Sequence, residues 1–393
     1  MSDIVLLFDR SEPDELGIRL TAKDMGIDLG YLPFYKIGLG FGENGLTYKS
    51  LGKDYTGELS ETQVVLNRTQ SKNRRIYAAS ILDALGKKVI NTYDVENICS
   101  SKVRTLLKLF YNGVKIPETI YIPSNVQEPI PQGGVMNNIN TVSMLIEDRL
   151  GSGKIVVKPD GGTHGRGIGL AEGEEGLKEL LKDVSPSIIN LSGVLAQEYV
   201  PKWFYDLRII VTKQKGSPIY CAPIAMARAG FGDFRTNTYL GNKIFHVELP
   251  PAVIKTAREG GEALLEGSDA GILAFDAMPF FREKYEVDEE SVKSAFTKLD
   301  ESFGGIQSVK SEPMKKKDFR NYSERLEAAY AVYTSTEEYH VVQEVIQDSL
   351  NWAQDSVVLH ECNACPEFWE QTRVISGVNV AEYLLNGALS LLE

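Results

Sequence analysis

The chain has 393 residues, 43% of them hydrophobic, which suits roughly two to three domains with cores of their own. Its 42 Lys and Arg residues are outnumbered by 54 Asp and Glu residues, giving a net charge of −12. This balance argues against a nucleic-acid or anionic-membrane binder, so an anionic substrate must be held by a local cluster of positive charge.

The composition also bears on location and redox chemistry. The sequence has no apolar run of about 18 residues and no charged leader followed by an apolar stretch, which predicts a cytoplasmic protein that does not enter a membrane. Its four cysteines are too few for a disulfide framework in a chain of this length.

The first part of the chain predicts a small α/β domain with a parallel sheet, over residues 1–97. Short apolar strands are expected at Ile4–Phe8, Val64–Leu66 and Lys88–Ile90, and a helix at Arg74–Leu85. Strands that alternate with helices in this way are typical of parallel sheets.

The middle part, residues 98–190, predicts a second unit. Ser101 is expected to cap a helix that ends at Asn112-Gly113, with Lys102 in its first turn. A strand at Glu118–Ile122 and a surface loop over Pro123–Asn140 follow, then a strand starting at Lys154 and a helix near Glu174–Val184.

Between these last two elements lies a glycine-rich loop, in the sequence K-I-V-V-K-P-D-G-G-T-H-G-R-G-I-G-L at residues 154–170. A β-branched strand leads Lys158 into it, and its glycines are Gly161, Gly162, Gly165, Gly167 and Gly169. Glycines permit positive φ and let backbone N–H groups approach an anion closely, which predicts a phosphate-binding loop. Neither the Walker A nor the dinucleotide pattern is present, and a plain hairpin turn is the alternative.

The last part, residues 191–393, begins with expected strands at Val194–Val200, Leu207–Thr212 and Ile219–Ala227. The segment after these strands supplies Arg228, Arg235 and Asn237 within ten positions. Two arginines so close together suit a polyphosphate or a carboxylate, since guanidinium groups bind planar oxyanions bidentately. A solvated charged hairpin is the alternative interpretation.

Three oxygen-bearing side chains follow near the ends of two further strands. Asp276 is expected at the end of one strand, and Glu361 and Asn363, two residues apart on another strand, share one face. His360 is expected on the opposite face. Such hard ligands suit Mg²⁺ that bridges phosphates, because Mg²⁺ commonly uses one or two carboxylates together with phosphate oxygens.

Taken in order, the motifs resemble the ATP-grasp carboxylate–amine ligases of the RimK type. The resemblance covers Lys102 to Phe281 and resumes from Val357 to the C-terminus. Its pieces are S-K-V-R-T-L, V-V-K-P-D-G-G-T-H-G-R-G-I-G, A-Q-E-Y-V, D-L-R-I-I-V, G-D-F-R-T-N, A-F-D, H-E-C-N-A-C-P-E-F and S-G-V-N-V-A-E-Y.

The resemblance implies an ATP-grasp fold of mixed α/β and α+β character, in which two lobes clasp ATP behind the N-terminal domain. It implies that nucleotide-binding residues are Lys102, Lys158, Gly162, Gly165, Gly167, Gln197, Glu198, Tyr199, Val200, Asp206, Arg235 and Asn237. It places Mg²⁺, for which Mn²⁺ can substitute, on Asp276, Glu361 and Asn363. The catalytic residues it implies are Arg208, Arg228 and Arg235.

The chemistry implied by the resemblance is amide formation through an acyl phosphate. An amino acid such as glutamate would be added to the carboxylate of a peptide, a protein tail or a cofactor. No protein nucleophile is needed, only positioning and charge neutralisation. The alternatives are a kinase of the same fold acting on a hydroxylated substrate, and a non-catalytic nucleotide-binding module. A homo-oligomer remains open.

Two features depart from the family pattern. An insertion at about 283–355 separates Asp276 from Glu361 in the sequence, which leaves the metal role of Asp276 open. The sequence of this insertion predicts helices at Ser323–Tyr333 and Glu337–Trp352. This insertion could cover the substrate pocket, contact another subunit or decorate the lobe. The second departure is the C-x-x-C at Cys362 and Cys365, for which we expect a structural role over a redox pair or an iron–sulfur or zinc site.

Overall fold

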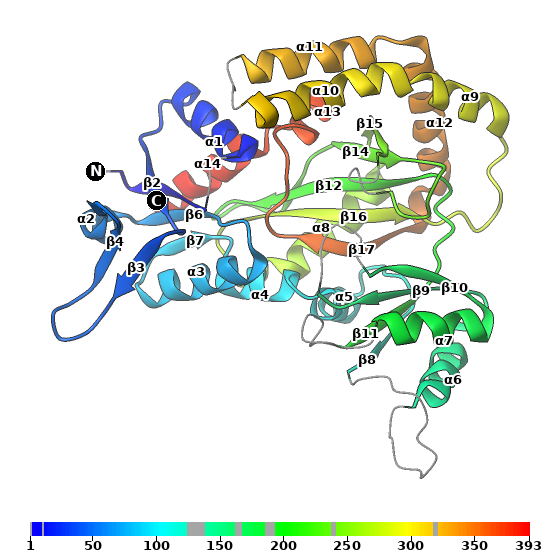
Figure 1. The fold of residues 1–393 in the computed structure, drawn as a ribbon, viewed down its shortest axis with the longest axis horizontal. Helices are drawn as coiled ribbons and strands as arrows, with labels where there is room; N and C mark the ends of the chain where they lie inside the picture. Colours follow the sequence, from blue (N-terminus) through cyan, green and yellow to red (C-terminus); the bar gives the residue numbers. More distant parts are fainter. Residues whose placement is uncertain are drawn as a thin grey trace.

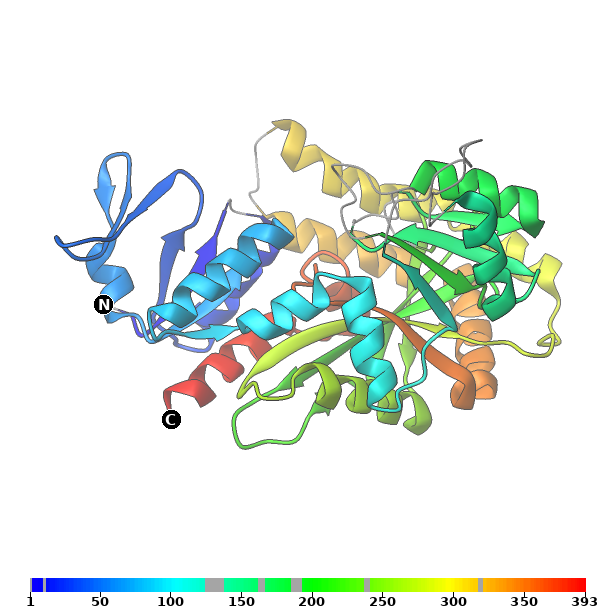
Figure 2. The same ribbon diagram turned by 90° about the horizontal axis from the view of Figure 1, so that it is seen from below.

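The structure is a computed structural model that describes residues 2–9, 12–123, 138–161, 167–184, 193–236, 241–316 and 321–393. Within these residues the strands form four sheets. Figure 1 shows the N-terminal sheet on one side, a small sheet with its helices below, and a larger sheet at the centre under a layer of helices. The view from below in Figure 2 shows the same three parts side by side.

The N-terminal sheet is parallel, as predicted, with the strand order β2-β1-β6-β7. Its strands are β1 (Ile4–Phe8), β2 (Leu29–Pro33), β6 (Val64–Arg68) and β7 (Lys88–Ile90), and its helices are α1 (Pro13–Asp24) and α3 (Lys72–Ala84). A small sheet of β3 (Ile37–Gly40), β4 (Thr47–Ser50) and β5 (Lys53–Asp54), followed by α2 (Thr56–Glu61), was not predicted. Its strands have two to four residues, too few for a recognisable alternation of apolar and polar side chains.

The middle sheet is antiparallel in the order β10-β9-β11-β8. Its strands are β8 (Thr119–Ile122), β9 (Lys154–Pro159), β10 (Gly169–Glu172) and β11 (Val194–Glu198), and it packs against α6 (Ile139–Leu150) and α7 (Gly173–Val184). Helices α4 (Tyr93–Cys99) and α5 (Lys102–Tyr111) precede it, and Ser101 caps α5 as predicted. The predicted loop over Pro123–Asn140 is wrong at its end, where α6 has already begun, and its residues 124–137 lie outside the described part.

The central sheet runs in the order β15-β14-β12-β16-β17, with β13 paired to β12. Its strands are β12 (Tyr205–Lys213), β13 (Tyr220–Cys221), β14 (Ile224–Ala229), β15 (Lys243–Glu248), β16 (Gly271–Pro279) and β17 (Val357–Asn363), and helix α8 (Pro251–Leu264) packs on it. The strand predicted at Ile219–Ala227 is two strands, because Pro223 between them has no N–H to donate to a neighbour. Asp276 lies within β16, which continues to Pro279, and not at a strand end.

The insertion forms the helices α9 (Glu289–Lys298), α10 (Asp300–Lys316), α11 (Tyr322–Thr334) and α12 (Glu337–Ala353), and a turn of 3-10 helix, η2 (Gln354–Ser356), leads into β17. The two helices predicted there are confirmed, and α9 and α10 were not predicted. Tyr333 and Tyr339 are fully buried against the sheet, where the Tyr333 hydroxyl donates to the Ile244 carbonyl at 3.1 Å. The insertion therefore supplies part of the core and does more than decorate the lobe.

The C-terminal helices α13 (Thr372–Ser376) and α14 (Val380–Leu392) complete the fold. Helix α14 packs between the N-terminal and central sheets, in one apolar cluster with Leu66 and Ile90 from the first and Ile210 and Ile272 from the second. This shared core fixes the N-terminal domain against the rest of the chain (Figure 1). In the described part of the chain, no helix has the length and apolarity needed to cross a bilayer.

Candidate functional site

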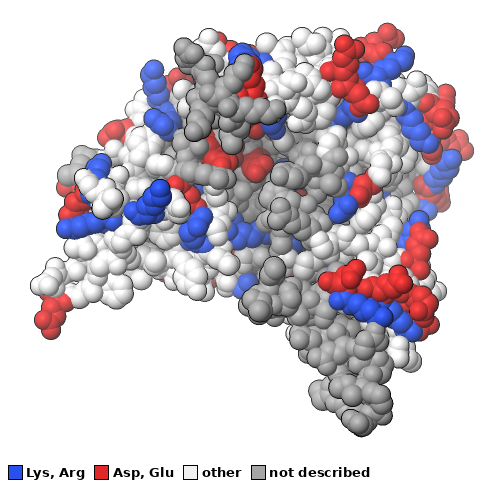
Figure 3. All heavy atoms as spheres, in the orientation of Figure 1, with Lys and Arg blue, Asp and Glu red and all other residues white. Residues whose placement is uncertain are grey.

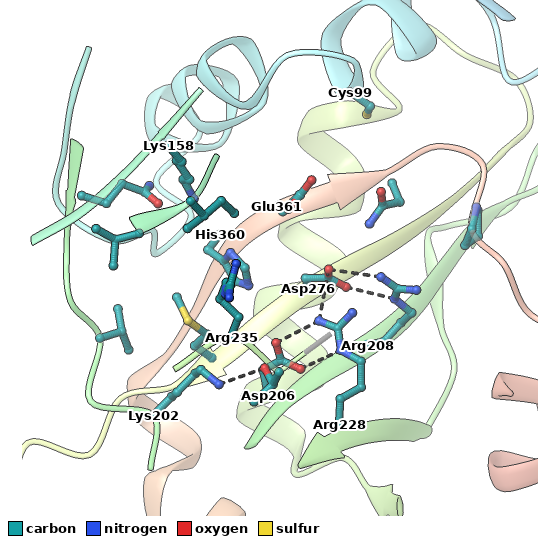
Figure 4. A pocket seen from close by; sticks show the side chains of 18 of the residues that line it. Cys99, Lys158, Lys202, Asp206, Arg208, Arg228, Arg235, Asp276, His360 and Glu361 are labelled. Atoms are coloured by element: carbon teal, nitrogen blue, oxygen red, sulfur yellow. Dashed lines mark hydrogen bonds and ion pairs between the residues drawn. The ribbon is translucent and has the colours of Figure 1, made fainter. Parts of the chain in front are cut away.

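A cavity of about 350 Å³ lies where the three parts meet. Strands β9 and β11 line one wall, β12, β16 and β17 line the floor, and the turn before α3 closes the end at the N-terminal domain. On the face drawn in Figure 3, acidic and basic side chains are interspersed over the surface. Figure 4 shows that both kinds of charge also meet inside the cavity, from strands that are distant in the sequence.

The pairing of β16 with β17 brings the predicted metal ligands together. Asp276 lies directly opposite Glu361 in the antiparallel register, and Ala274 lies opposite Asn363. Residues that face each other in this way project to the same side of a sheet, and Asp276, Glu361 and Asn363 all line the cavity. The insertion leaves the sheet after β16 and returns at β17, so it does not separate the two carboxylates.

Asp276 is held by two arginines. Its carboxylate accepts from Arg208 Nε at 3.0 Å and Nη2 at 3.2 Å, and its Oδ2 lies 3.1 Å from Arg228 Nη2 (Figure 4). Burial would raise the pKa of Asp276, but the two guanidinium groups outweigh burial and lower the pKa well below its usual range. Asp276 is therefore a charged carboxylate at neutral pH.

Arg228 joins two carboxylates, Asp206 and Asp276, and all three side chains line the cavity. Its Nε and Nη2 donate to Asp206 at 2.7 and 2.9 Å, and Nη2 also contacts Asp276. Both Asp206 and Arg228 are buried, on the neighbouring strands β12 and β14. Buried ion pairs of this kind are costly to break, so the network holds Asp276 in one position.

Lys102 is the first residue of α5, and its Nζ lies 3.6 Å from Glu361 Oε1. A cation is unfavourable at the N-terminus of a helix, because the helix dipole is positive there. Asp160 offsets this cost, since its Oδ1 accepts from the Ser101 hydroxyl at 2.9 Å and the Val103 N–H at 2.8 Å. Asp160 was missed from the sequence, although an acidic residue at the start of a glycine-rich loop was the available signal.

Lys158 projects into the cavity from β9 and is buried. Burial, together with the charge of Lys102, lowers its pKa to about 8. Burial alone would raise the pKa of Glu361, but Lys102, Lys72 and Lys158 lower it to about 2 despite the repulsion of Asp276. The result is a carboxylate surrounded by lysines, a charge arrangement suited to a metal–phosphate complex.

Part of the glycine-rich loop lies within the described residues. Gly167 has φ +70°, as expected for a loop that depends on glycine. The predicted binding residues Gly162, Gly165 and Asn237 lie outside the described residues.

The segment predicted to meet adenine lines one wall, with Gln197, Glu198, Tyr199 and Val200 all at the cavity. Gln197 Nε2 donates to Thr119 Oγ1 at 2.8 Å, and the Glu198 carboxylate accepts from the Glu118 N–H at 2.9 Å. Side-chain hydrogen bonds to the start of the neighbouring strand β8 therefore hold this edge in place. Lys202, missed from the sequence, also lines the cavity; burial lowers its pKa to about 8, and its Nζ donates to Thr236 Oγ1 at 2.9 Å.

Arg235 reaches the cavity from the segment after β14 (Figure 4). It forms an ion pair with Asp233, whose Oδ2 lies 2.7 Å from its Nη2.

His360 was predicted on the wrong face. The register shifts between Asp276 and Ala277, which pair with Glu361 and Leu359 respectively, so His360 is the extra residue of a β-bulge. The bulge interrupts the alternation of side chains, and His360 lines the cavity beside Glu361 (Figure 4). Burial and the charge of Lys158 lower its pKa to about 4, so it is neutral at neutral pH.

The two cysteines of the C-x-x-C are not partners. Cys362 Sγ lies 3.8 Å from Cys99 Sγ on α4, and all four cysteines are free. Among the described residues there is no group of three or more His, Cys, Asp or Glu side chains that could hold a metal ion. The zinc and iron–sulfur interpretations therefore have no ligand set in the part of the chain that the structure describes.

Comparison with known proteins finds a family model and curated relatives that match part of the chain. A family model described as the RimK-like ATP-grasp domain matches residues 124–264. The "Alpha-aminoadipate--LysW ligase LysX" of Sulfurisphaera tokodaii is 26% identical over 50% of this chain and 61% of its own length. The "Probable alpha-L-glutamate ligase" of a Picosynechococcus species is 26% identical over 46% of this chain and 53% of its own. The chain thus spans less than two thirds of the length of these relatives.

Solved structures match over the whole chain. The D-alanyl-alanine synthetase A of Vibrio cholerae aligns with 100% of this chain and 99% of its own, with a TM-score of 0.59 and 10% identity. The ATP-grasp ligase PsnB, in a complex that includes Mg and ADP, aligns with 100% and 99%, with a TM-score of 0.54 and 10% identity. At such identity the likeness shows the fold alone.

Proposed function

This chain carries a RimK-like ATP-grasp domain in an ATP-grasp fold, and we propose that it is an ATP- and Mg²⁺-dependent carboxylate–amine ligase. In the first step a substrate carboxylate attacks the γ-phosphorus of ATP, so that ADP leaves and an acyl phosphate forms. In the second step an amine attacks the acyl carbon, phosphate leaves, the amine loses a proton and an amide results.

The observation that carries this proposal is the pairing of Asp276 with Glu361 on the cavity floor, with Lys158 lining the same cavity and Lys102 Nζ 3.6 Å from Glu361 Oε1. A phosphoryl transfer needs hard oxygen ligands for the metal and cations for the phosphates, all placed before the reaction. Both sets occur at this site, on the strands β9, β16 and β17 and at the start of the helix α5.

The residues present fit a magnesium ion. Glu361 lies 3.6 Å from Lys102 Nζ, longer than a hydrogen bond, and Asp276 retains lone pairs beyond those used by the arginines. Asp276, Glu361 and Asn363 would hold Mg²⁺ or Mn²⁺, which when bound neutralises phosphate charge and orients the phosphates.

The cavity side chains fall into two groups, one for the nucleotide and one for the acyl substrate. Lys102 and Lys158 would bind the phosphates, and the Gln197–Val200 edge would meet adenine, with Arg235 on the phosphate side. Arg208, with 16% of its side chain exposed, would face the acyl group and stabilise the oxyanion of the tetrahedral intermediate. Arg228, bound to Asp206 and Asp276, would position Asp276 and not contact substrate.

The names of the relatives support an amino acid as the amine donor, since they are ligases of α-aminoadipate and glutamate. We propose an amino acid such as glutamate, joined to the carboxylate of a peptide, a protein tail or a cofactor. The chain spans only part of these relatives, so the acceptor is left to the experiment.

The test is ADP release from Mg·ATP with a panel of carboxylates, each with and without a panel of amino acids, with the products identified by mass. Turnover that needs both partners, with a product heavier by one amino acid less water, supports the ligase. Turnover with a hydroxylated compound alone, which gains a phosphate, would identify a kinase and refute the proposal.

A further inference from the structure

The end of the cavity at the N-terminal domain has no role in the function proposed above. It is lined by Gln70, Lys72 and Arg75, which come from the turn after β6 and the first turn of α3. Pro366 and Glu367, which follow β17, line the same cavity.

The turn that carries Lys72 is braced on both sides. Asn67 Nδ2 donates to the Arg75 carbonyl at 2.9 Å, and Arg75 Nη1 donates to the carbonyls of Thr69 at 3.0 Å and Gln70 at 3.1 Å. Arg75 is itself held by Glu96, at 2.9 Å. The backbone of Lys72 therefore has a defined position.

The N-terminal domain is also attached firmly to the central lobe at this end. Arg68, the last residue of β6, donates through Nη1 and Nη2 to the Pro366 carbonyl at 3.3 and 3.2 Å, and Nη2 also binds Asp14 at 3.0 Å. Arg68 is buried. The wall that carries Lys72 is thus fixed relative to β17 and its metal ligands.

The ammonium group of Lys72 has no hydrogen-bond or ion-pair partner among the described residues, although most of the side chain is covered. The arginines that line the cavity are all paired with carboxylates: Arg75 with Glu96, Arg208 and Arg228 with Asp276, and Arg235 with Asp233. Burial lowers the pKa of Lys72, and the charge of Glu361 acts against that shift. A cation held in a partly desolvated position without a counter-ion is a ready site for an anion.

Lys72, from the N-terminal domain, and Lys158, from β9, both line the cavity, and the charge of each lowers the pKa of Glu361. Lys158 lies on the nucleotide side, so Lys72 is available for an anion on the substrate side. We propose that Lys72 binds the reacting carboxylate of the acyl substrate and holds it against the γ-phosphoryl group. This inference rests on the ligase function proposed above.

The physical reason is the repulsion between the two reactants. A carboxylate that attacks a phosphoryl group must approach a second anion, and a cation on its own side reduces this repulsion and fixes its orientation. In the step, a carboxylate oxygen forms a bond to the γ-phosphorus as the bond to the ADP oxygen breaks. Lys72 gives up no proton and remains paired with the acyl-phosphate product.

The test compares wild type with Lys72→Met, Lys72→Arg and the control Lys255→Met. Lys255 lies on α8 with 77% of its side chain exposed, and its loss also removes one positive charge. For the most active carboxylate of the panel, Lys72→Met should raise the KM by about 10- to 100-fold, the loss of one charge-assisted hydrogen bond. Lys72→Arg should raise this KM less than Lys72→Met does, and Lys255→Met should leave the KM at the wild-type value.

Two further measurements separate this role from others. Thermal stabilisation by Mg²⁺ and a non-hydrolysable ATP analogue should not weaken in Lys72→Met, and its weakening would assign Lys72 to the phosphates and overturn the proposal. Hydroxylamine, which traps an acyl phosphate as a hydroxamate, should yield less product in Lys72→Met at low carboxylate concentration. A carboxylate KM equal to wild type would refute the role of Lys72 alone, whereas a wild type that uses no carboxylate would refute both proposals.

Discussion

Replacing Asp276 by Asn should destabilise the protein as well as inactivate it, because this carboxylate serves two arginines in addition to the metal. The substitution removes the charge that accepts from Arg208 at 3.0 and 3.2 Å and lies 3.1 Å from Arg228. Removing one partner of a buried ion pair costs roughly 3–5 kcal/mol. Arg228 would still be paired with Asp206, and Arg208 is partly exposed to solvent. We therefore expect a loss of unfolding free energy at the lower end of this range, about 3 kcal/mol.

The assay is thermal unfolding of the ligand-free protein at pH 7. With an unfolding entropy of about 2.1 cal/mol/K per residue, a loss of about 3 kcal/mol lowers the Tm of a 393-residue chain by about 4 °C. Because the pKa of Asp276 is lowered in the folded state, its contribution is fully present above the ordinary value of 3.8 and is lost as the pH falls through the folded-state pKa. The difference in Tm between Asp276→Asn and wild type should therefore persist down to about pH 4 and become smaller below that pH.

Glu361→Gln is the matched control. It also removes one carboxylate charge from the metal site, but it breaks a single contact of 3.6 Å and leaves the side chain of similar shape. The lysines that lower the pKa of Glu361 lose a counter-charge, but no arginine loses its partner, so we expect a smaller fall in Tm than for Asp276→Asn and the same loss of ADP release. An equal fall in Tm for Asp276→Asn and Glu361→Gln would refute the idea that the arginine network sets the cost.

Three other predictions concern the nucleotide, the pH dependence and the thiols. Lys158→Met should abolish most of the thermal stabilisation by Mg²⁺ and an ATP analogue, measured as the Tm shift; a full shift would show that Lys158 does not bind phosphate. Burial raises the pKa of Glu15 to about 7 in spite of Arg68, so its contribution to stability is present below pH 4.5 and is lost as the pH rises through 7. Glu15→Gln should therefore flatten the Tm profile over this window, and an unchanged profile would contradict the shift. Cys362→Ser combined with Cys365→Ser should retain ligase turnover, since neither thiol has a disulfide or metal partner in the described structure; lost turnover with an intact fold would restore the redox interpretation.

Local features of the chain predicted much of the fold. The apolar runs at Ile4–Phe8 and Val64–Leu66 predicted the parallel sheet, because strands buried on both faces need continuous apolar side chains. The Ser101 cap and the helices α11 and α12 of the insertion were predicted for a similar reason, since capping and helical periodicity act over three or four residues.

The order of the motifs by itself predicted the ATP-grasp fold, but only the tertiary structure decided which side chains meet. Asp276 and Glu361 are opposite each other because β16 and β17 pair across the whole insertion, and no local pattern encodes a contact of that range. His360 faces the cavity because one extra residue in β17 shifts the alternation, a change that depends on the neighbouring strand. Lys72 reaches the same site only because a shared core packs its domain against the central sheet, so its place beside Glu361 is a property of the packed protein.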